Sequence, residues 1–338
     1  MTKNPWPAIL VAFLIGFLAG VFTGGGGDSL PGAAFDLGSV FFKQKTPSAN
    51  TTSDNTKVNI SQPDTELSKD DEGPSESHDS NFSVSSPIDN AKKIAYLAKY
   101  YRKRSAIEWL GEELPDGAGP TTIYVGVTKE GEESSGITRP LDEYSRFNHI
   151  WILVSPEDLR NLSRKFQSIL GHEMCHAVLS TAYPELLPPW VLEGIACSGE
   201  PSEFLEKIKL ERLLKYYVKR LVANDVGTKI LSNQIVKIIN EKRGFAKYEV
   251  NAHAISWSLV EYLIDLGQAQ IQKKDKTKTE AEAKAEAKLN FIDFAIAGNK
   301  NENGWNNALK EHYGIKDVNE LVKNLTEWLK EFVNSKNK

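Results

Sequence analysis

An H-E-x-x-H pattern lies in the segment Ser168-Ile169-Leu170-Gly171-His172-Glu173-Met174-Cys175-His176-Ala177-Val178. The segment reads as a helix, and at about 100° per helical residue His172, Glu173 and His176 share one face. The opposite side is apolar and carries Phe166, Leu170, Met174, Ala177 and Val178. Such a helix can bury its apolar side while its polar face lines a cleft. We therefore expect the rest of the fold to be organised around this helix.

The spacing of the two histidines is typical of a metal site. Two neutral imidazoles one turn apart can both reach a Zn²⁺ ion at about 2.0–2.1 Å, while the Glu beside the first His acts on the water as general base. A catalytic zinc keeps three protein ligands and one open position. The best candidate for the third ligand is Glu193, in a second short helix that begins near Pro188. We expect Zn²⁺ at His172, His176 and Glu193, with Glu173 as the catalytic base.

At these residues the sequence resembles the gluzincin metallopeptidases, and most closely the peptidase-MA-like domains of exported or membrane-anchored bacterial proteins. The resemblance rests on His172-Glu173-x-x-His176 and on Trp190-x-x-Glu193-Gly194-x-Ala196. It implies an α+β, zincin-like fold, in which a small mixed β-sheet and the active-site helix are joined to a mainly helical C-terminal subdomain. It also implies a zinc-dependent endopeptidase that hydrolyses a peptide or protein substrate.

The resemblance further implies a donor for the oxyanion of the tetrahedral intermediate. The helix expected from Asn251 to Asp265 resembles a family helix that commonly carries a Tyr near its start and a Ser-Trp pair. Tyr248 and His253 are therefore additional catalytic candidates, and one well-placed donor is worth about 3–4 kcal/mol in the transition state. The alternative is that either side chain is an ordinary core or surface residue.

Two runs rich in β-branched and aromatic residues, 121–127 and 149–154, are expected to supply the sheet, with a Gly/Glu/Ser-rich loop at 130–136 between them. In gluzincins the edge strand before the zinc helix pairs with the substrate backbone, and by resemblance the second run is the candidate for that strand. The alternative is that both runs are ordinary core strands.

The N-terminal segment is directed to a membrane. An uncharged run from Trp6 to Phe22 follows Lys3, and at about 17 residues it is compatible with a transmembrane anchor or with a cleavable signal. We favour a single-pass anchor in residues 1–23. Lys3 on the cytoplasmic side would place the catalytic domain outside the cytoplasm, in the cell envelope or periplasm or at the surface.

The remaining chain divides by composition. A linker rich in Ser, Thr, Asp, Pro and Gly has too few apolar residues to fold, and a metallopeptidase domain follows it. The linker is expected at 24–87 and the domain at 88–335, with sheet and zinc helix in 88–180, a helical subdomain in 181–335 and a solvated Lys/Glu/Ala-rich helical insertion at 272–289.

Charge and cysteine content limit the functional classes. A net charge of −4 gives no electrostatic reason to expect nucleic-acid binding. Cys175 and Cys197 lie next to the expected ligands. They could form a disulfide with each other or remain two buried free thiols, and the sequence leaves both alternatives open. Two rival functions remain: a catalytically inactive zincin-like binding or scaffold module of the cell envelope, and a hydrolase of another amide or an ester.

Overall fold

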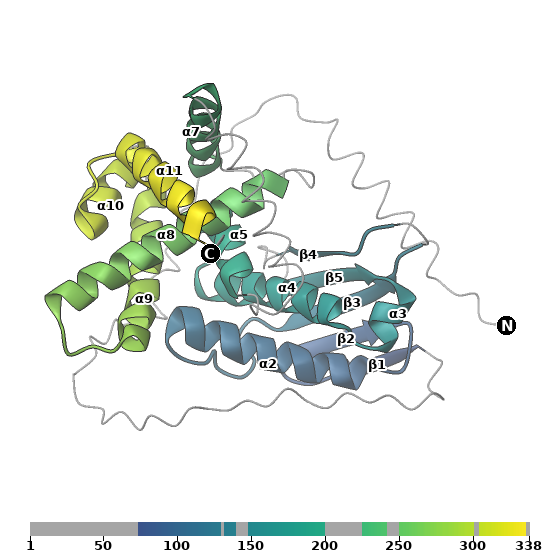
Figure 1. The fold of residues 1–338 in the computed structure, drawn as a ribbon. Helices are drawn as coiled ribbons and strands as arrows, with labels where there is room; N and C mark the ends of the chain where they lie inside the picture. The colour runs from purple at the N-terminus through teal and green to yellow at the C-terminus, as the bar shows by residue number, and fades with distance from the viewer. Residues whose placement is uncertain are drawn as a thin grey trace, which may run out of the picture. The chain divides into compact units, whose positions relative to one another are not determined.

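The computed structural model of the chain describes residues 74–129, 132–139, 148–199, 225–241, 250–300 and 304–335. The fold is mixed α/β: a five-stranded sheet forms one part and a group of packed helices forms the other (Figure 1). The expected combination of a small mixed sheet with a largely helical C-terminal region is therefore present. Residues 200–224, which belong to the expected helical subdomain 181–335, lie outside the described residues.

The sheet has the strand order β1-β2-β3-β5-β4. Its strands are β1 (Ser75–His78), β2 (Phe82–Ser86), β3 (Thr121–Val127), β4 (Ser135–Arg139) and β5 (Asn148–Val154). The inner pairs β2-β3 and β3-β5 are parallel, whereas β1-β2 and β4-β5 are antiparallel. Residues 75–86, which the sequence analysis placed in the linker, thus form two strands of the sheet. Buried and half-buried residues alternate along β2, where Phe82, Val84 and Ser86 are buried. The Ser-rich composition of the segment gave no sign of this alternation.

The strand at the sheet edge next to the H-E-x-x-H helix also differs from the expectation. The run 149–154 is an inner strand, β5, paired on one side with β3 and on the other with β4. The edge is formed by β4, which includes two residues of the expected loop 130–136. Of the two alternatives left open for this run, the structure contains the ordinary inner strand, because edge or interior placement depends on the order of the strands and not on their own composition.

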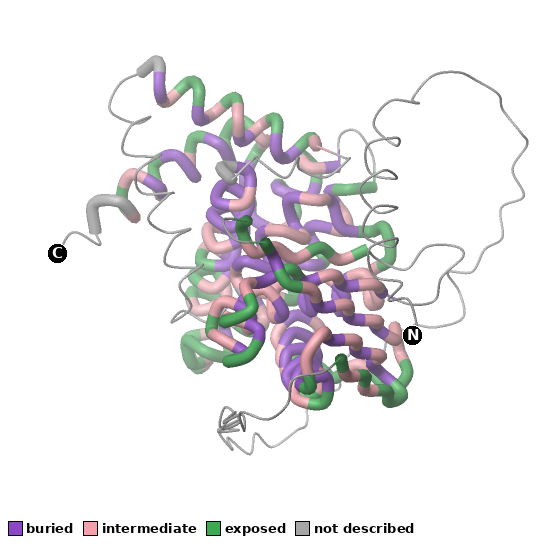
Figure 2. Tube along the Cα trace, turned by 90° about the vertical axis from the view of Figure 1, so that its right-hand side faces the viewer, coloured by how far each residue is buried: buried purple, intermediate pink, exposed green. Residues whose placement is uncertain are grey.

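Helices α2 (Ala91–Leu110) and α4 (Arg164–Ala182) cover one face of the sheet, and the short helix α3 (Pro156–Arg160) leads from β5 into α4 (Figure 1). Alternate residues of the strands face these helices and form a core that excludes water. This core contains Val84, Ile123, Val125, Ile150, Ile152, Ile94, Leu97, Tyr101, Phe166, Leu170 and Met174. Figure 2 shows buried and exposed positions recurring in turn along the described chain.

A second core joins the C-terminal helices. They are α5 (Pro189–Gly199), α7 (Asp225–Ile239), α8 (Val250–Lys274), α9 (Glu280–Asn299), α10 (Gly304–Tyr313) and α11 (Val318–Ser335). Its aromatic centre places Trp190 against Phe291 and Trp305, with ring centroids 6.2 and 5.4 Å away. Residues of α2 and α4 also belong to it, namely Trp109, Cys175 and Leu179. Helix α4 is therefore held between the two cores.

Polar contacts fix α4 against the sheet as well. Asn148, fully buried at the start of β5, donates from Nδ2 to the carbonyl oxygen of Ala177 at 3.3 Å and to Oγ1 of Thr181 at 3.0 Å. Its Oδ1 accepts a hydrogen bond from Ser180 at 3.0 Å. At the other end of α4, the backbone N–H of Phe166 donates to the Ser163 side chain, a typical N-cap. These bonds set the position of the helix along the sheet.

The Lys/Glu/Ala-rich run 272–289 is helical over most of its length, as expected, and most of its residues are exposed or half-buried. It contains the end of α8 and the start of α9, which begins with a capping box between Thr279 and Glu282. Ala283 and Ala287 of α9 are buried. Small side chains let helices approach closely, so the run packs even without large apolar residues.

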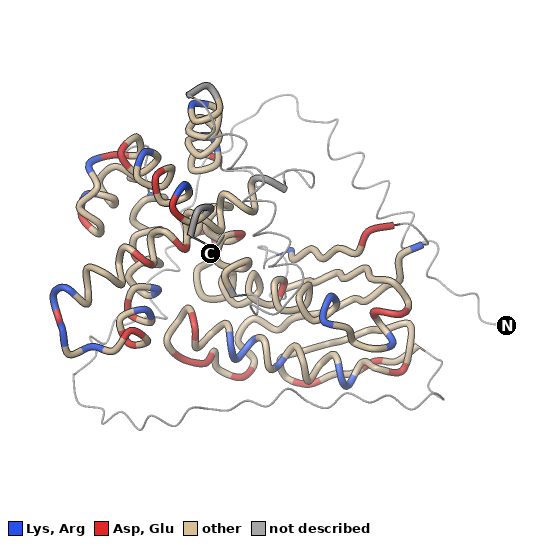
Figure 3. The backbone as a smooth tube through the Cα atoms, in the orientation of Figure 1, with Lys and Arg blue, Asp and Glu red and all other residues tan. Residues whose placement is uncertain are grey.

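The prediction of a membrane anchor is not retained. In the part of the chain that the structure describes, no helix combines the length and the apolar character needed to cross a membrane. We therefore withdraw the sequence-based assignments of a transmembrane helix, a signal anchor and a membrane localisation. Residues 1–23, on which they were based, lie outside the described residues. Basic and acidic residues both occur on α2, α9 and α11 (Figure 3).

The assignment of β2 to the sheet is testable by substitution. Phe82 is 3% exposed in the sheet core, so Phe82→Ala should lower the free energy of unfolding by about 3–5 kcal/mol. Ser85→Ala, on the other face of the same strand, should change it by less than about 0.5 kcal/mol. Urea unfolding followed by circular dichroism measures both. Equal stability of the two variants would remove β2 from the folded core.

Candidate metal centre

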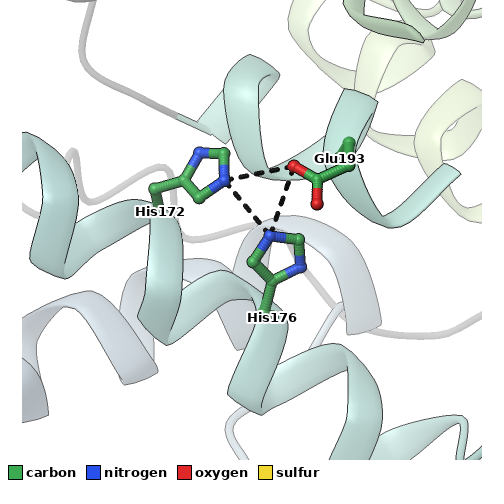
Figure 4. A group of neighbouring side chains, drawn as sticks. All are labelled: His172, His176 and Glu193. Carbon is green, nitrogen blue, oxygen red and sulfur yellow. Dashed lines mark hydrogen bonds and ion pairs between the residues drawn. The ribbon is translucent and has the colours of Figure 1, made fainter. Parts of the chain in front are cut away.

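Helix α4 presents His172 and His176 one turn apart, and α5 brings Glu193 to face them (Figure 4). The two Nε2 atoms are 3.1 Å apart. Oε2 of Glu193 lies 3.4 Å from Nε2 of His172 and 3.6 Å from Nε2 of His176. The three predicted ligands are thus brought together. Among the described residues, they form a group of side chains that could hold a metal ion.

The dimensions of this triangle fit a tetrahedral metal. Ligand atoms bound at about 2.0–2.1 Å around a tetrahedral zinc are about 3.3–3.4 Å apart. The three observed separations, 3.1, 3.4 and 3.6 Å, lie around that value. The residue types also suit zinc, because imidazole nitrogen and carboxylate oxygen are common ligands of a catalytic site.

The electrostatics of Glu193 also favour a cation at this position. Its Oε2 is buried and accepts no hydrogen bond from the residues that the structure describes. Burial alone would raise the pKa of Glu193, but the imidazoles of His176, His172 and His253 outweigh burial and hold the pKa well below its usual range. The group therefore presents an ionised carboxylate whose Oε2 faces three imidazoles, and a metal ion would satisfy that oxygen.

His253 of α8 lies at the same centre. Its Nε2 is 3.2 Å from Oε2 of Glu193, and a third of its side chain is exposed. It is outside the three-residue metal-ligand group. The structure therefore places this predicted residue beside the ligands, as a donor to a bound group requires. Tyr248, the other predicted oxyanion donor, lies outside the described residues.

Close packing of α5 on α8 brings Glu193 and His253 together. A Cβ atom at Gly194 would lie 2.5 Å from the backbone oxygen of Ser256 and 2.5 Å from Cγ2 of Val260. Only a glycine leaves room for this approach. Ser198, one turn further along α5, donates a hydrogen bond to Glu261 of α8. Gly194, the glycine of the E-G-x-A pattern, is thus required because a larger side chain would clash with α8.

Glu173 follows the first ligand on α4 and is 6% exposed. It is absent from the ligand group, as a general base should be. Its carboxylate lies against β4, where Thr138 donates to it at 2.5 Å. Thr138 and Gly136 were missed by the sequence analysis, because they lie in and next to a stretch that was read as a loop and carry no motif.

The two cysteines near the site form no disulfide, and both are buried. Burial, together with the charge of Glu108, raises the pKa of Cys175 to about 12. A neutral, buried thiol is a poor metal ligand, since the thiolate is the binding form. Of the two alternatives left open by the sequence, the structure therefore contains the pair of free thiols.

Comparisons with protein-family models, with curated proteins and with solved structures gave no significant match to this chain. The functional argument therefore rests on the geometry of the site.

The close approach of α5 and α8 predicts the effect of a single methyl group. Gly194→Ala should separate the two helices and move Glu193 from the histidines, and we expect at least a tenfold loss of zinc affinity together with about 1–3 kcal/mol of stability. Calorimetric titration with Zn²⁺ and urea unfolding measure the two effects. Gly267→Ala is a matched control on α8, because an added Cβ there meets its nearest atom at an ordinary 3.4 Å. Wild-type zinc affinity in Gly194→Ala would contradict this account.

Proposed function

We propose that the chain is a zinc-dependent metallopeptidase of the gluzincin type, with a zincin-like arrangement of sheet and active-site helix. The observation that carries this proposal is the triangle of His172, His176 and Glu193, with Glu173 adjacent on the same helix but outside the ligand group. These residues would hold the zinc. The metal, when bound, supplies a Lewis acid that polarises a carbonyl group and lowers the pKa of water.

The side chains of the protein would divide the remaining tasks of peptide hydrolysis. Glu173 accepts a proton as water adds to the scissile carbonyl carbon, and the same proton passes to the nitrogen of the leaving amine as the C–N bond breaks. His253, beside the ligands, is placed to donate a hydrogen bond to the oxygen on which charge develops. Burial of Glu173 keeps bulk water from its carboxylate.

The sheet would contribute to binding an extended peptide. Strand β4 is the edge of the five-stranded sheet and pairs with β5 on one side. It also contacts α4 at Glu173. Main-chain groups at a free strand edge bind peptides of varied sequence, because the hydrogen bonds do not involve side chains. The substrate-pairing role that the sequence assigned to 149–154 is thus proposed for β4.

Substitution of the general base separates metal binding from catalysis. Glu173→Gln should keep one zinc per chain, because the residue is not a ligand, and should lower turnover by at least about 10³-fold, because the amide cannot accept the proton. Zinc content by atomic absorption and cleavage of a peptide library by the full-length chain are the measurements. Glu311→Gln, an exposed glutamate on α10, is the control and should behave as wild type.

Each other result selects a different function. A zinc-loaded wild-type chain without peptide cleavage would favour the catalytically inactive binding module, or a hydrolase of another amide or an ester. A Glu173→Gln variant with undiminished activity would remove Glu173 from the reaction.

A further inference from the structure

The edge strand β4 crosses α4 at the position of Glu173. Oγ1 of Thr138 lies 2.5 Å from Oε2 of Glu173 and 3.1 Å from the backbone oxygen of the same residue. A hydroxyl group has one hydrogen to donate, and the shorter contact identifies the carboxylate as its acceptor. Hydrogen bonds from a hydroxyl to a charged carboxylate are short, about 2.5–2.7 Å, and about twice as strong as neutral ones.

Gly136 lies two residues earlier on the same face of β4. A Cβ atom there would be 2.5 Å from Oε1 of Glu173, 2.7 Å from its Cγ and 2.7 Å from Cγ2 of Ile169. The glycine thus provides the space that the carboxylate occupies. One oxygen of Glu173 is held by Thr138, and the other lies against the backbone at Gly136.

A carboxylate held in this way is fixed before any substrate binds. A glutamate side chain loses rotamer entropy when it is fixed, and packing and hydrogen bonds must offset that cost. The contact with β4 supplies both for Glu173, whereas the metal ligands do not hold it. A base fixed within about 0.5 Å of its working position needs no reorganisation during the reaction.

We propose that Thr138 is a positioning residue for Glu173, and that Gly136 provides the space in which the carboxylate is held. This inference rests on the proposed function, because it assigns Glu173 as the base. Among the described residues Thr138 hydrogen-bonds to Glu173, so its proposed action is through Glu173. The edge strand then has two roles: its outer main-chain edge receives the peptide and its inner face holds the base.

The test compares two substitutions at Thr138 in the full-length, zinc-loaded chain. Thr138→Val keeps the shape of the side chain and removes the hydroxyl, and it should lower kcat by about 10- to 100-fold, the range expected for a hydrogen bond to a charged group. KM and zinc content should stay within about twofold of wild type. Thr138→Ser restores the hydroxyl and should recover most of kcat.

Two further variants separate positioning from general damage. In the Glu173→Gln background Thr138→Val should cause no further loss, because residues that act as a unit are not additive. Gly136→Ala should lower kcat while zinc stays bound, because its methyl group displaces the carboxylate. Val127→Ala is the control in the sheet; Val127 lies at the end of the inner strand β3, outside the proposed site, and is 46% exposed.

The outcomes distinguish the two proposals. If the wild-type chain cleaves peptides and Glu173→Gln does not, but Thr138→Val keeps its kcat, the role of Thr138 is overturned and the proposed function stands. A higher kcat in Thr138→Val would also overturn it, since the hydroxyl would then hold the base away from its working position. If the zinc-loaded wild-type chain cleaves no peptide, both proposals fail together.

Discussion

The convergence of three electron-pair donors on one point is the constraint on which this structure depends. Two imidazole nitrogens and one carboxylate oxygen lie within 3.6 Å of one another. A cation between them would attract all three atoms and offset the repulsion between their electron pairs. The surrounding fold maintains it. Helix α4 is held between two hydrophobic cores, and α5 is brought to α4 while Gly194 lets it pack on α8. The ligands therefore come from rigid elements, which position a site more precisely than loops do.

The same helix serves a second purpose through its neighbour β4. His172 faces the ligand triangle, while Glu173, the next residue, faces the edge strand, where Thr138 and Gly136 form the space for its carboxylate. The geometry of the helix thus separates the proposed ligand His172 from the proposed base Glu173, although the two residues are adjacent in the chain. A change in the register of β4 would therefore move the carboxylate of Glu173 together with the strand edge at which a peptide is proposed to bind.

The sequence predicted the parts of the site that follow local rules. The i, i+4 spacing of the histidines determines their shared helix face, and Glu193 was found from its own short helix motif. Strand β4, in contrast, was missed, since Ser135–Arg139 has no strong alternation and becomes a strand by pairing with β5. Strand β1 is polar throughout and was read as linker for the same reason. The contact between Thr138 and Glu173 spans 35 residues and depends on the order of strands, which no local pattern contains.

The central claim is that His172, His176 and Glu193 bind one catalytic zinc, and X-ray absorption spectroscopy of the zinc-loaded full-length chain tests it most directly. The account predicts two imidazole nitrogens and one or two oxygens at about 2.0–2.2 Å, with the fourth position taken by water. A Glu193→Ala chain should lose an oxygen ligand or fail to hold the metal. A sulfur ligand at about 2.3 Å would assign the metal to a cysteine, and a chain that binds no zinc would show that the triangle is held by hydrogen bonds alone.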